Sequence, residues 1–98
     1  MNASTILNEI LAEREQQKKQ GFDAAHDDAL RAHQWEARIV RYVARATILQ
    51  RAGSPALARR RLVQVAALAL AAVEALDRAE AAVAATAGQA PSTGSGQA

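Results

Sequence analysis

A three-residue break, Gly53-Ser54-Pro55, separates the two longest helical patterns and constrains the fold more than any other feature. Glycine commonly ends a helix because it adopts the left-handed conformation without strain. Serine caps the next helix, and proline suits its first position, where a missing N–H is harmless. We therefore expect one helix from about Ala29 to Ala52 and another from Pro55 to about Thr86, joined by a tight turn.

The N-terminal segment carries a third helical pattern. Its apolar side chains recur at helical spacing and are Ile6, Leu7, Ile10 and Leu11. We expect Ser4 or Thr5 to cap this helix and Gly21 to end it. Residues 22–28 then form a short connection, in which Asp27 or Asp28 caps the second helix.

Two polar residues, Arg14 and Gln17, continue the apolar face of this first helix. A polar side chain on an inward face is unfavourable unless it finds a partner. Two interpretations remain open: the end of the helix emerges into solvent, or both side chains face a polar cavity.

The last helix is apolar on more than one face. One stripe contains Leu62, Val65, Ala66, Ala69, Val73, Leu76 and Val83, whereas Val63, Leu68 and Leu70 occupy other faces. A helix that is apolar on several sides needs neighbours on several sides, which two other helices cannot supply. We therefore expect self-association as a dimer or a higher symmetric oligomer.

Together these patterns predict an all-α fold, a three-helix antiparallel bundle. With 98 residues the chain is one domain at most. We assign residues 1–87 to the helical domain and the low-complexity sequence of residues 88–98 to a flexible tail.

Composition excludes several classes of function. A net charge of +2 and an aromatic content of 3% do not fit a nucleic-acid binder. The absence of cysteine excludes disulfides, thiolate catalysis and cysteine-based zinc sites. No secretory signal is visible, and the most apolar segment, residues 62–76, is too short to span a bilayer. We expect a cytoplasmic protein without a membrane partner.

Arginines at three- and four-residue spacing define what we call the arginine ridge: Arg31, Arg38, Arg41 and Arg45. A second basic cluster, residues 59–61, opens the following helix, where the helix dipole disfavours positive charge. Guanidinium groups converging from two helices suit a phosphate or carboxylate ligand. The alternative is a solvated charged face, paired with Glu36 and neighbouring acids.

Other candidate residues lie near these arginines. Phe22 and His26 are in the expected connection, where ligand contacts are common. Tyr42 and Trp35 suit a core or interface as well as a ligand. Gln64 is a lone polar residue that, if buried, needs a hydrogen-bond partner. A metal site from Glu74 with Asp77, or Glu9 with Glu13, is a further alternative.

Two segments resemble known sequences. The run ILAEREQQKKQGFDAAHDD resembles a pattern common in small phage and prophage proteins, carried here by Glu13, Arg14, Gln17, Gly21, Phe22, His26, Asp27 and Asp28. The run RLVQVAALALAAVEALDR, residues 61–78, is similar to a segment of small MazG-like proteins. Together they cover about half of the chain.

The resemblance implies an all-α nucleoside triphosphate pyrophosphohydrolase that works as a dimer or tetramer. Such enzymes hold Mg²⁺ with the carboxylates of EE-x-x-E on one helix and E-x-x-D on the next. In our alignment Arg41, Tyr42 and Arg45 replace the first set of carboxylates, and Arg61 and Gln64 replace the second. Arginine cannot bind Mg²⁺, but it can neutralise phosphate charge.

Three hypotheses follow. The first is a non-catalytic, oligomeric protein without cofactor or metal that sequesters a small anionic nucleotide, as phage sponge proteins do with host defence signals. Its ligand-binding residues are Arg14, Gln17, Phe22, His26, Arg41, Tyr42, Arg45, Arg61 and Gln64. The second is a MazG-like pyrophosphohydrolase that uses displaced carboxylates. The third is a helical module whose arginine ridge meets an acidic protein.

Overall fold

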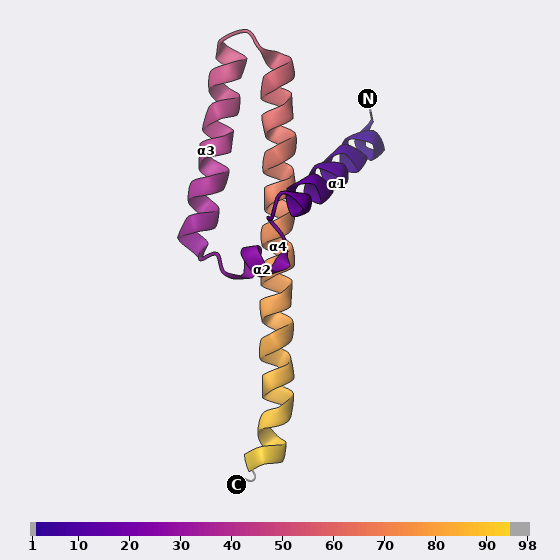
Figure 1. The fold of residues 1–98 in the computed structure, drawn as a ribbon, viewed down its shortest axis with the longest axis vertical. Coiled ribbons are helices and arrows are strands. Elements are labelled where there is room, and N and C mark those ends of the chain that lie inside the picture. Colours follow the sequence, from indigo (N-terminus) through magenta and orange to yellow (C-terminus); the bar gives the residue numbers. More distant parts are fainter. Residues whose placement is uncertain (1, 95–98) are drawn as a thin grey trace.

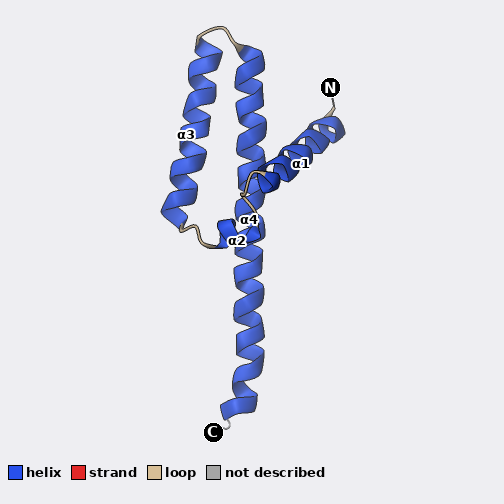
Figure 2. Cartoon of the chain, in the orientation of Figure 1, coloured by secondary structure: helices blue, strands red, loops and turns tan. Residues whose placement is uncertain are grey.

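The computed structural model describes the backbone of residues 2–94 and the side chains of residues 2–87. Four helices contain all of the regular structure in this range: α1 (Ala3–Lys19), α2 (Ala24–Asp28), α3 (Ala32–Arg51) and α4 (Pro55–Gly94). Figures 1 and 2 show them as an antiparallel hairpin of α3 and α4, crossed by α1. No strand is present among the described residues, so the all-α prediction is confirmed.

The turn between α3 and α4 is the one that the sequence predicts. Gly53 has a φ of +81°, and its N–H donates to the carbonyl of Gln50 at 3.1 Å. The N–H of Ser54 donates to the carbonyl of Leu49 at 2.9 Å, which completes a Schellman motif. Helix α4 begins at Pro55, as expected.

The same motif ends α1. Gly21 has a φ of +100°, and its N–H donates to the carbonyl of Lys18, while the N–H of Phe22 donates to that of Gln17. The predicted cap at Ser4 or Thr5 was wrong. Asn2 caps α1 instead, because its Oδ1 accepts the N–H of Thr5 at 2.9 Å.

The segment expected to be a plain connection contains the short helix α2. Asp23 caps this helix by accepting the N–H of His26 at 3.1 Å. Asp27 and Asp28 therefore lie inside α2, and the prediction that one of them caps the second helix was wrong. That helix, α3, begins at Ala32 rather than at Ala29, after Arg31 as its cap residue. Both aspartates bind arginines instead.

Helix α4 is the element that the other three contact. In Figure 1, α3 lies along the first half of α4, and α1 and α2 meet α4 near its middle. The second half of α4 extends beyond all three. The described chain is therefore a crossed helical hairpin, and a closed three-helix bundle remains a prediction.

Helix α4 also runs further than the sequence led us to expect. It continues to Gly94, eight residues beyond the predicted end at Thr86. Alanine has the highest helix propensity, so the alanine-rich residues 79–87 favour helix up to the predicted end, whereas the continuation past Gly88 and Pro91 has no explanation in the sequence. Residues 95–98 of the predicted tail lie outside the described residues.

The core of the single chain is small. Its buried apolar side chains are Ala46, Ala58, Ala67, Leu68 and Ala71. Four members of the predicted inward stripe are at least half exposed: Leu62, Val73, Leu76 and Val83. The radius of gyration is 18.3 Å, compared with about 13 Å for a compact domain of this length.

Leu68 is the one large aliphatic side chain in this core, at 5% exposure. We expect Leu68→Ala to lower the free energy of unfolding by roughly 2–5 kcal/mol, because it leaves a cavity between helices. Leu62→Ala is the matched control on the same helix, at 50% exposure. Urea denaturation followed by circular dichroism measures both, and equal losses would contradict this description of the core.

Candidate functional site

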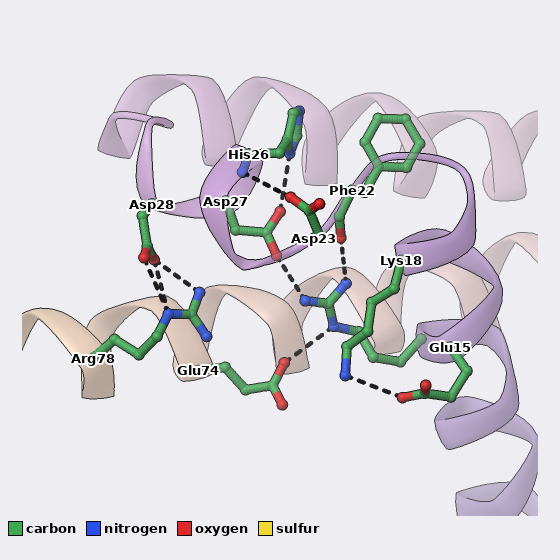
Figure 3. Close-up of polar contacts among 10 residues, drawn as sticks. Glu15, Lys18, Phe22, Asp23, His26, Asp27, Asp28, Glu74 and Arg78 are labelled. Atoms are coloured by element: carbon green, nitrogen blue, oxygen red, sulfur yellow. Dashed lines mark hydrogen bonds and ion pairs between the residues drawn. The ribbon is translucent and has the colours of Figure 1, made fainter.

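The guanidinium of Arg14 is a buried charge, since this residue is only 2% exposed. Its Nε donates to Glu74 at 3.0 Å, one terminal nitrogen to the carbonyl of Phe22 at 2.8 Å, and the other to Asp27 at 2.7 Å. These acceptors come from α4, the α1–α2 turn and α2, as Figure 3 shows. Arg14 thus ties three parts of the chain to α1.

Asp27 is also 2% exposed and has a second partner, because its Oδ1 lies 3.0 Å from Nδ1 of His26. Next to it, Arg78 of α4 makes a bidentate contact with Asp28, with its shortest bond at 2.8 Å (Figure 3). The two segments that carry the family resemblance therefore contact one another through two ion pairs.

For Arg14 and Gln17, the burial excludes the interpretation in which the helix end emerges into solvent. Gln17 is 5% exposed, and its Nε2 lies 3.5 Å from the backbone carbonyl of Gln64 and from Glu13. Its Oε1 is buried and has no hydrogen-bond partner among the described residues. A buried acceptor without a donor is unfavourable and marks a place where a ligand or water can bind.

Two adjoining cavities open along the α3–α4 hairpin, and we call them together the arginine cleft. The first, of about 190 Å³, is lined by Glu13, Gln17, Gln20, Phe22, Arg38, Arg41, Tyr42, Gln64 and Leu68. The second, of about 320 Å³, is lined by Arg45, Leu49, Leu57, Arg60, Arg61 and Gln64. Gln64 lines both cavities.

The cleft brings together seven of the nine predicted ligand-binding residues: Gln17, Phe22, Arg41, Tyr42, Arg45, Arg61 and Gln64. Arg14 and His26 do not line it. Arg14 is occupied by its three acceptors, and His26 packs edge-on against Phe22, with ring centres 5.0 Å apart. The structure thus places these two residues behind the cleft.

Aromatic rings hold two of the arginines in place. The Arg61 guanidinium lies 5.6 Å above the ring of Tyr42 and donates to Oε1 of Gln64 at 3.1 Å. The Arg38 guanidinium lies 5.1 Å above the ring of Phe22. Such contacts orient a guanidinium without neutralising its charge.

The charge of the cleft is unbalanced. Five arginines line it, namely Arg38, Arg41, Arg45, Arg60 and Arg61, against a single carboxylate, that of Glu13. Within residues 2–87, none of these arginines forms an ion pair with an acidic side chain. These contacts therefore do not match the alternative predicted from the sequence, in which the arginine ridge is a solvated face paired with Glu36 and neighbouring acids.

Two arginines that the sequence grouped with the cleft lie elsewhere. Arg31 precedes α3 as its cap residue, so the helical part of the arginine ridge begins at Arg38. Arg59 makes a bidentate contact with Glu9 at 2.7 and 2.8 Å. This hydrogen-bonded guanidinium lowers the pKa of the Glu9 carboxyl below its usual value.

The carboxylates that the sequence offered as an alternative metal site do not lie together. Glu74 accepts from Arg14 and Glu9 from Arg59, while Glu13 lines the arginine cleft. Among the residues described, no group of three His, Asp or Glu side chains is arranged to hold a metal ion.

Sequence reasoning missed the partners of Arg14 and the lining residue Gln20, and it left Arg38 and Arg60 out of the ligand-binding set although both belong to its basic clusters. Arg38 lies seven residues before Arg45, on the same face of a helix, and this spacing carried the information, whereas Arg60 adjoins Arg61 and had no such spacing signal. The pairing of Arg14 with Asp27 had no local signal, because it depends on how α2 folds back.

Replacing Arg14 tests its structural role. We expect Arg14→Met to lower the free energy of unfolding by roughly 3–5 kcal/mol, because the buried Asp27 carboxylate loses its main partner. Adding Asp27→Asn should restore part of that loss by removing the buried charge. Lys18→Met is the control, since the exposed Lys18–Glu15 pair contributes roughly 0–1 kcal/mol. Thermal or urea denaturation distinguishes these outcomes, and similar losses for Lys18→Met and Arg14→Met would refute the role.

No helix in the described part of the chain has the length and apolarity needed to cross a membrane. Comparison with known proteins matched no family model, no curated protein and no solved structure. The resemblance to small MazG-like proteins therefore stays an interpretation of the sequence.

Proposed function

We propose that this protein is a non-catalytic nucleotide-binding protein that holds the phosphates of its ligand in the arginine cleft. The observation that carries the proposal is the group of five guanidiniums around two adjoining cavities, without an ion-pair partner among the described residues. Like charges gathered in this way repel one another, and an anion relieves that repulsion. Phosphate oxygens match the planar fork of a guanidinium.

The second cavity suits the phosphates best. Arg45, Arg60 and Arg61 line it together with the aliphatic side chains of Leu49 and Leu57, and no carboxylate is among its lining residues. Arg61 is oriented by Tyr42 and Gln64 before any ligand arrives. A guanidinium that is already fixed loses less side-chain entropy when it binds.

The first cavity suits the base or sugar. Phe22 and Tyr42 supply ring surface, and Gln17 supplies an acceptor, Oε1, that lacks a donor. An exocyclic amine of a base or a ribose hydroxyl can donate to that oxygen once the Gln17 amide turns toward the cavity, because the oxygen itself is buried in the single chain. Glu13 offers a further acceptor in the same cavity. Polar groups of this kind would orient a ligand whose phosphates lie among the arginines.

Capture without hydrolysis fits the residues better than catalysis does. In the MazG-like alignment, arginines and a tyrosine occupy the positions of the first metal-binding motif, and Arg61 and Gln64 those of the second. Guanidiniums at those positions attract phosphate but do not coordinate Mg²⁺. Together with the resemblance to phage and prophage proteins, this supports an oligomeric sponge that sequesters a nucleotide immune signal in the host cytoplasm.

Isothermal titration calorimetry against nucleoside mono- and triphosphates, cyclic dinucleotides and ADP-ribose tests the proposal. We expect at least one of these ligands to bind. Arg45→Ala and Arg61→Ala should each weaken that ligand at least about tenfold, since a hydrogen bond to a charged group contributes roughly 1.5–3 kcal/mol. Arg51→Ala is the matched control, because Arg51 is an exposed arginine of α3 that does not line the cleft.

The bound nucleotide should be recovered intact after incubation with Mg²⁺. Magnesium-dependent release of pyrophosphate that Glu74→Gln or Asp77→Asn abolishes would replace this proposal with the hydrolase. If no ligand of the panel binds, the proposal fails.

Replacing Arg45 by lysine separates charge from geometry. Arg45→Lys keeps the positive charge but loses the bidentate fork. We expect Arg45→Lys to bind the nucleotide with an affinity between those of the unmodified protein and Arg45→Ala. As salt concentration rises, its affinity should decline about as steeply as that of the unmodified protein. Calorimetry at two salt concentrations measures both effects. Full affinity in Arg45→Lys would show that the fork makes no specific contact.

A further inference from the structure

The second half of α4 forms one wall of an apolar groove that lies apart from the arginine cleft. We call it the Trp35 groove, and its volume is about 520 Å³. One wall is formed by Leu30 and Trp35, and the other by Ala75, Leu76, Ala79 and Ala82 of α4, while Asp27, Asp28 and Arg78 also line the groove. Leu76 is 69% exposed, so this wall carries large apolar surface that the single chain leaves in solvent.

The apolar positions on this part of α4 follow a seven-residue repeat. Alanines occur at 72, 75, 79 and 82, and the larger Leu76 and Val83 follow the second and fourth of these alanines. Such spacing gives a helix a continuous face for another helix. Because the alanine side chains are small, a partner helix can approach closely.

The exposed area is more than a compact monomer leaves in solvent. The chain exposes 6727 Å², whereas a folded monomer of 10.4 kDa exposes about 5,400 Å². The excess of about 1,300 Å² is larger than the roughly 800 Å² that each partner buries in a standard interface. An interface of ordinary size is therefore within the area that the chain exposes.

We propose that a second copy of this chain fills the Trp35 groove, so that residues 72–86 of two α4 helices pack antiparallel about a two-fold axis near Ala79. About a two-fold axis, the α4 helix of each copy fills the Trp35 groove of the other. Both surfaces are covered at once, because each chain carries both. This proposal does not depend on nucleotide binding.

The antiparallel register places large side chains opposite small ones. With the axis at Ala79, Leu76 of one copy faces Ala82 of the other, and Val83 faces Ala75. Arg78 and Glu80 flank the axis, so each Glu80 is next to the Arg78 of the other copy, which keeps its ion pair with its own Asp28. A parallel arrangement would place like charges together at the same positions, which is unfavourable.

Sedimentation of the full-length protein, with and without a charge in the groove, tests this interface. We expect a dimer, and we expect Leu76→Glu to raise the dissociation constant at least about 100-fold, because it buries an unpaired carboxylate. Ile48→Glu is the matched control, since Ile48 is 62% exposed on α3 and does not line the groove. Circular dichroism checks that both variants remain helical. A monomeric unmodified protein, or a dimer that Leu76→Glu leaves intact, overturns the proposal.

Cysteine cross-linking tests the register without a disruptive substitution, because the chain has no cysteine of its own. Ala79→Cys should form a disulfide with itself across the axis. In a mixture, Ala72→Cys chains should cross-link to Thr86→Cys chains and not to one another. Disulfides between two copies of Ala72→Cys instead would indicate parallel helices and refute the register.

The two proposals can fail separately. Calorimetry on Leu76→Glu should show unchanged nucleotide affinity per chain, since Leu76 does not line the arginine cleft. Loss of the dimer with retained nucleotide binding supports both proposals. A dimer that binds no nucleotide removes only the proposed function.

Discussion

The buried guanidinium of Arg14 is the contact on which the arrangement of the helices depends. A charge with 2% exposure is stable only when it is paired and hydrogen-bonded, and Arg14 finds acceptors on Asp27, Glu74 and the carbonyl of Phe22. Because these acceptors belong to different elements, they fix the angle at which α1 crosses α4. They also fix the turn that holds Phe22 against Arg38 and the α1 position that brings Gln17 near Gln64. The polar contact behind the arginine cleft thus positions part of its lining.

This dependence on one polar contact reflects the scarcity of apolar packing. Four of the five buried apolar residues are alanines, and an alanine buries little area, so the hydrophobic contribution to stability is small. The α3–α4 hairpin closes through its turn and an alanine-rich seam, while Leu76 and Val83 stay exposed. Helix α4 therefore has three surfaces with different tasks. One packs on α3, one meets Arg14 through Glu74, and one, which carries Leu76 and Val83, stays exposed in the single chain.

The sequence predicted those parts of the fold that are encoded locally. The Gly53-Ser54-Pro55 turn and the end of α1 at Gly21 depend on a few adjacent residues, and both were confirmed. Five of the seven cleft residues were found on two adjacent helices, α3 and α4, whereas Gln17 was found by its place on the apolar face of α1 and Phe22 by its place in the connection. The role of Asp27 was missed, since a cap and an ion-pair partner require the same residue type. Only the tertiary position of Arg14 decides between them.

Charge distribution explains how a chain with a net charge of only +2 can present a strongly basic cleft. Among the described residues, the acids Asp27, Glu74, Asp28 and Glu9 are engaged by Arg14, Arg78 and Arg59. These pairs are held outside the cleft and bring the helices together. Five of the remaining arginines, Arg38, Arg41, Arg45, Arg60 and Arg61, have no such partners and line the two cavities along the α3–α4 hairpin. Because a local field depends on nearby charges rather than on the total, this separation favours anion binding despite the small net charge. The same acids that assemble the fold are therefore withheld from the arginine cleft, which supports the proposed phosphate binding over metal coordination.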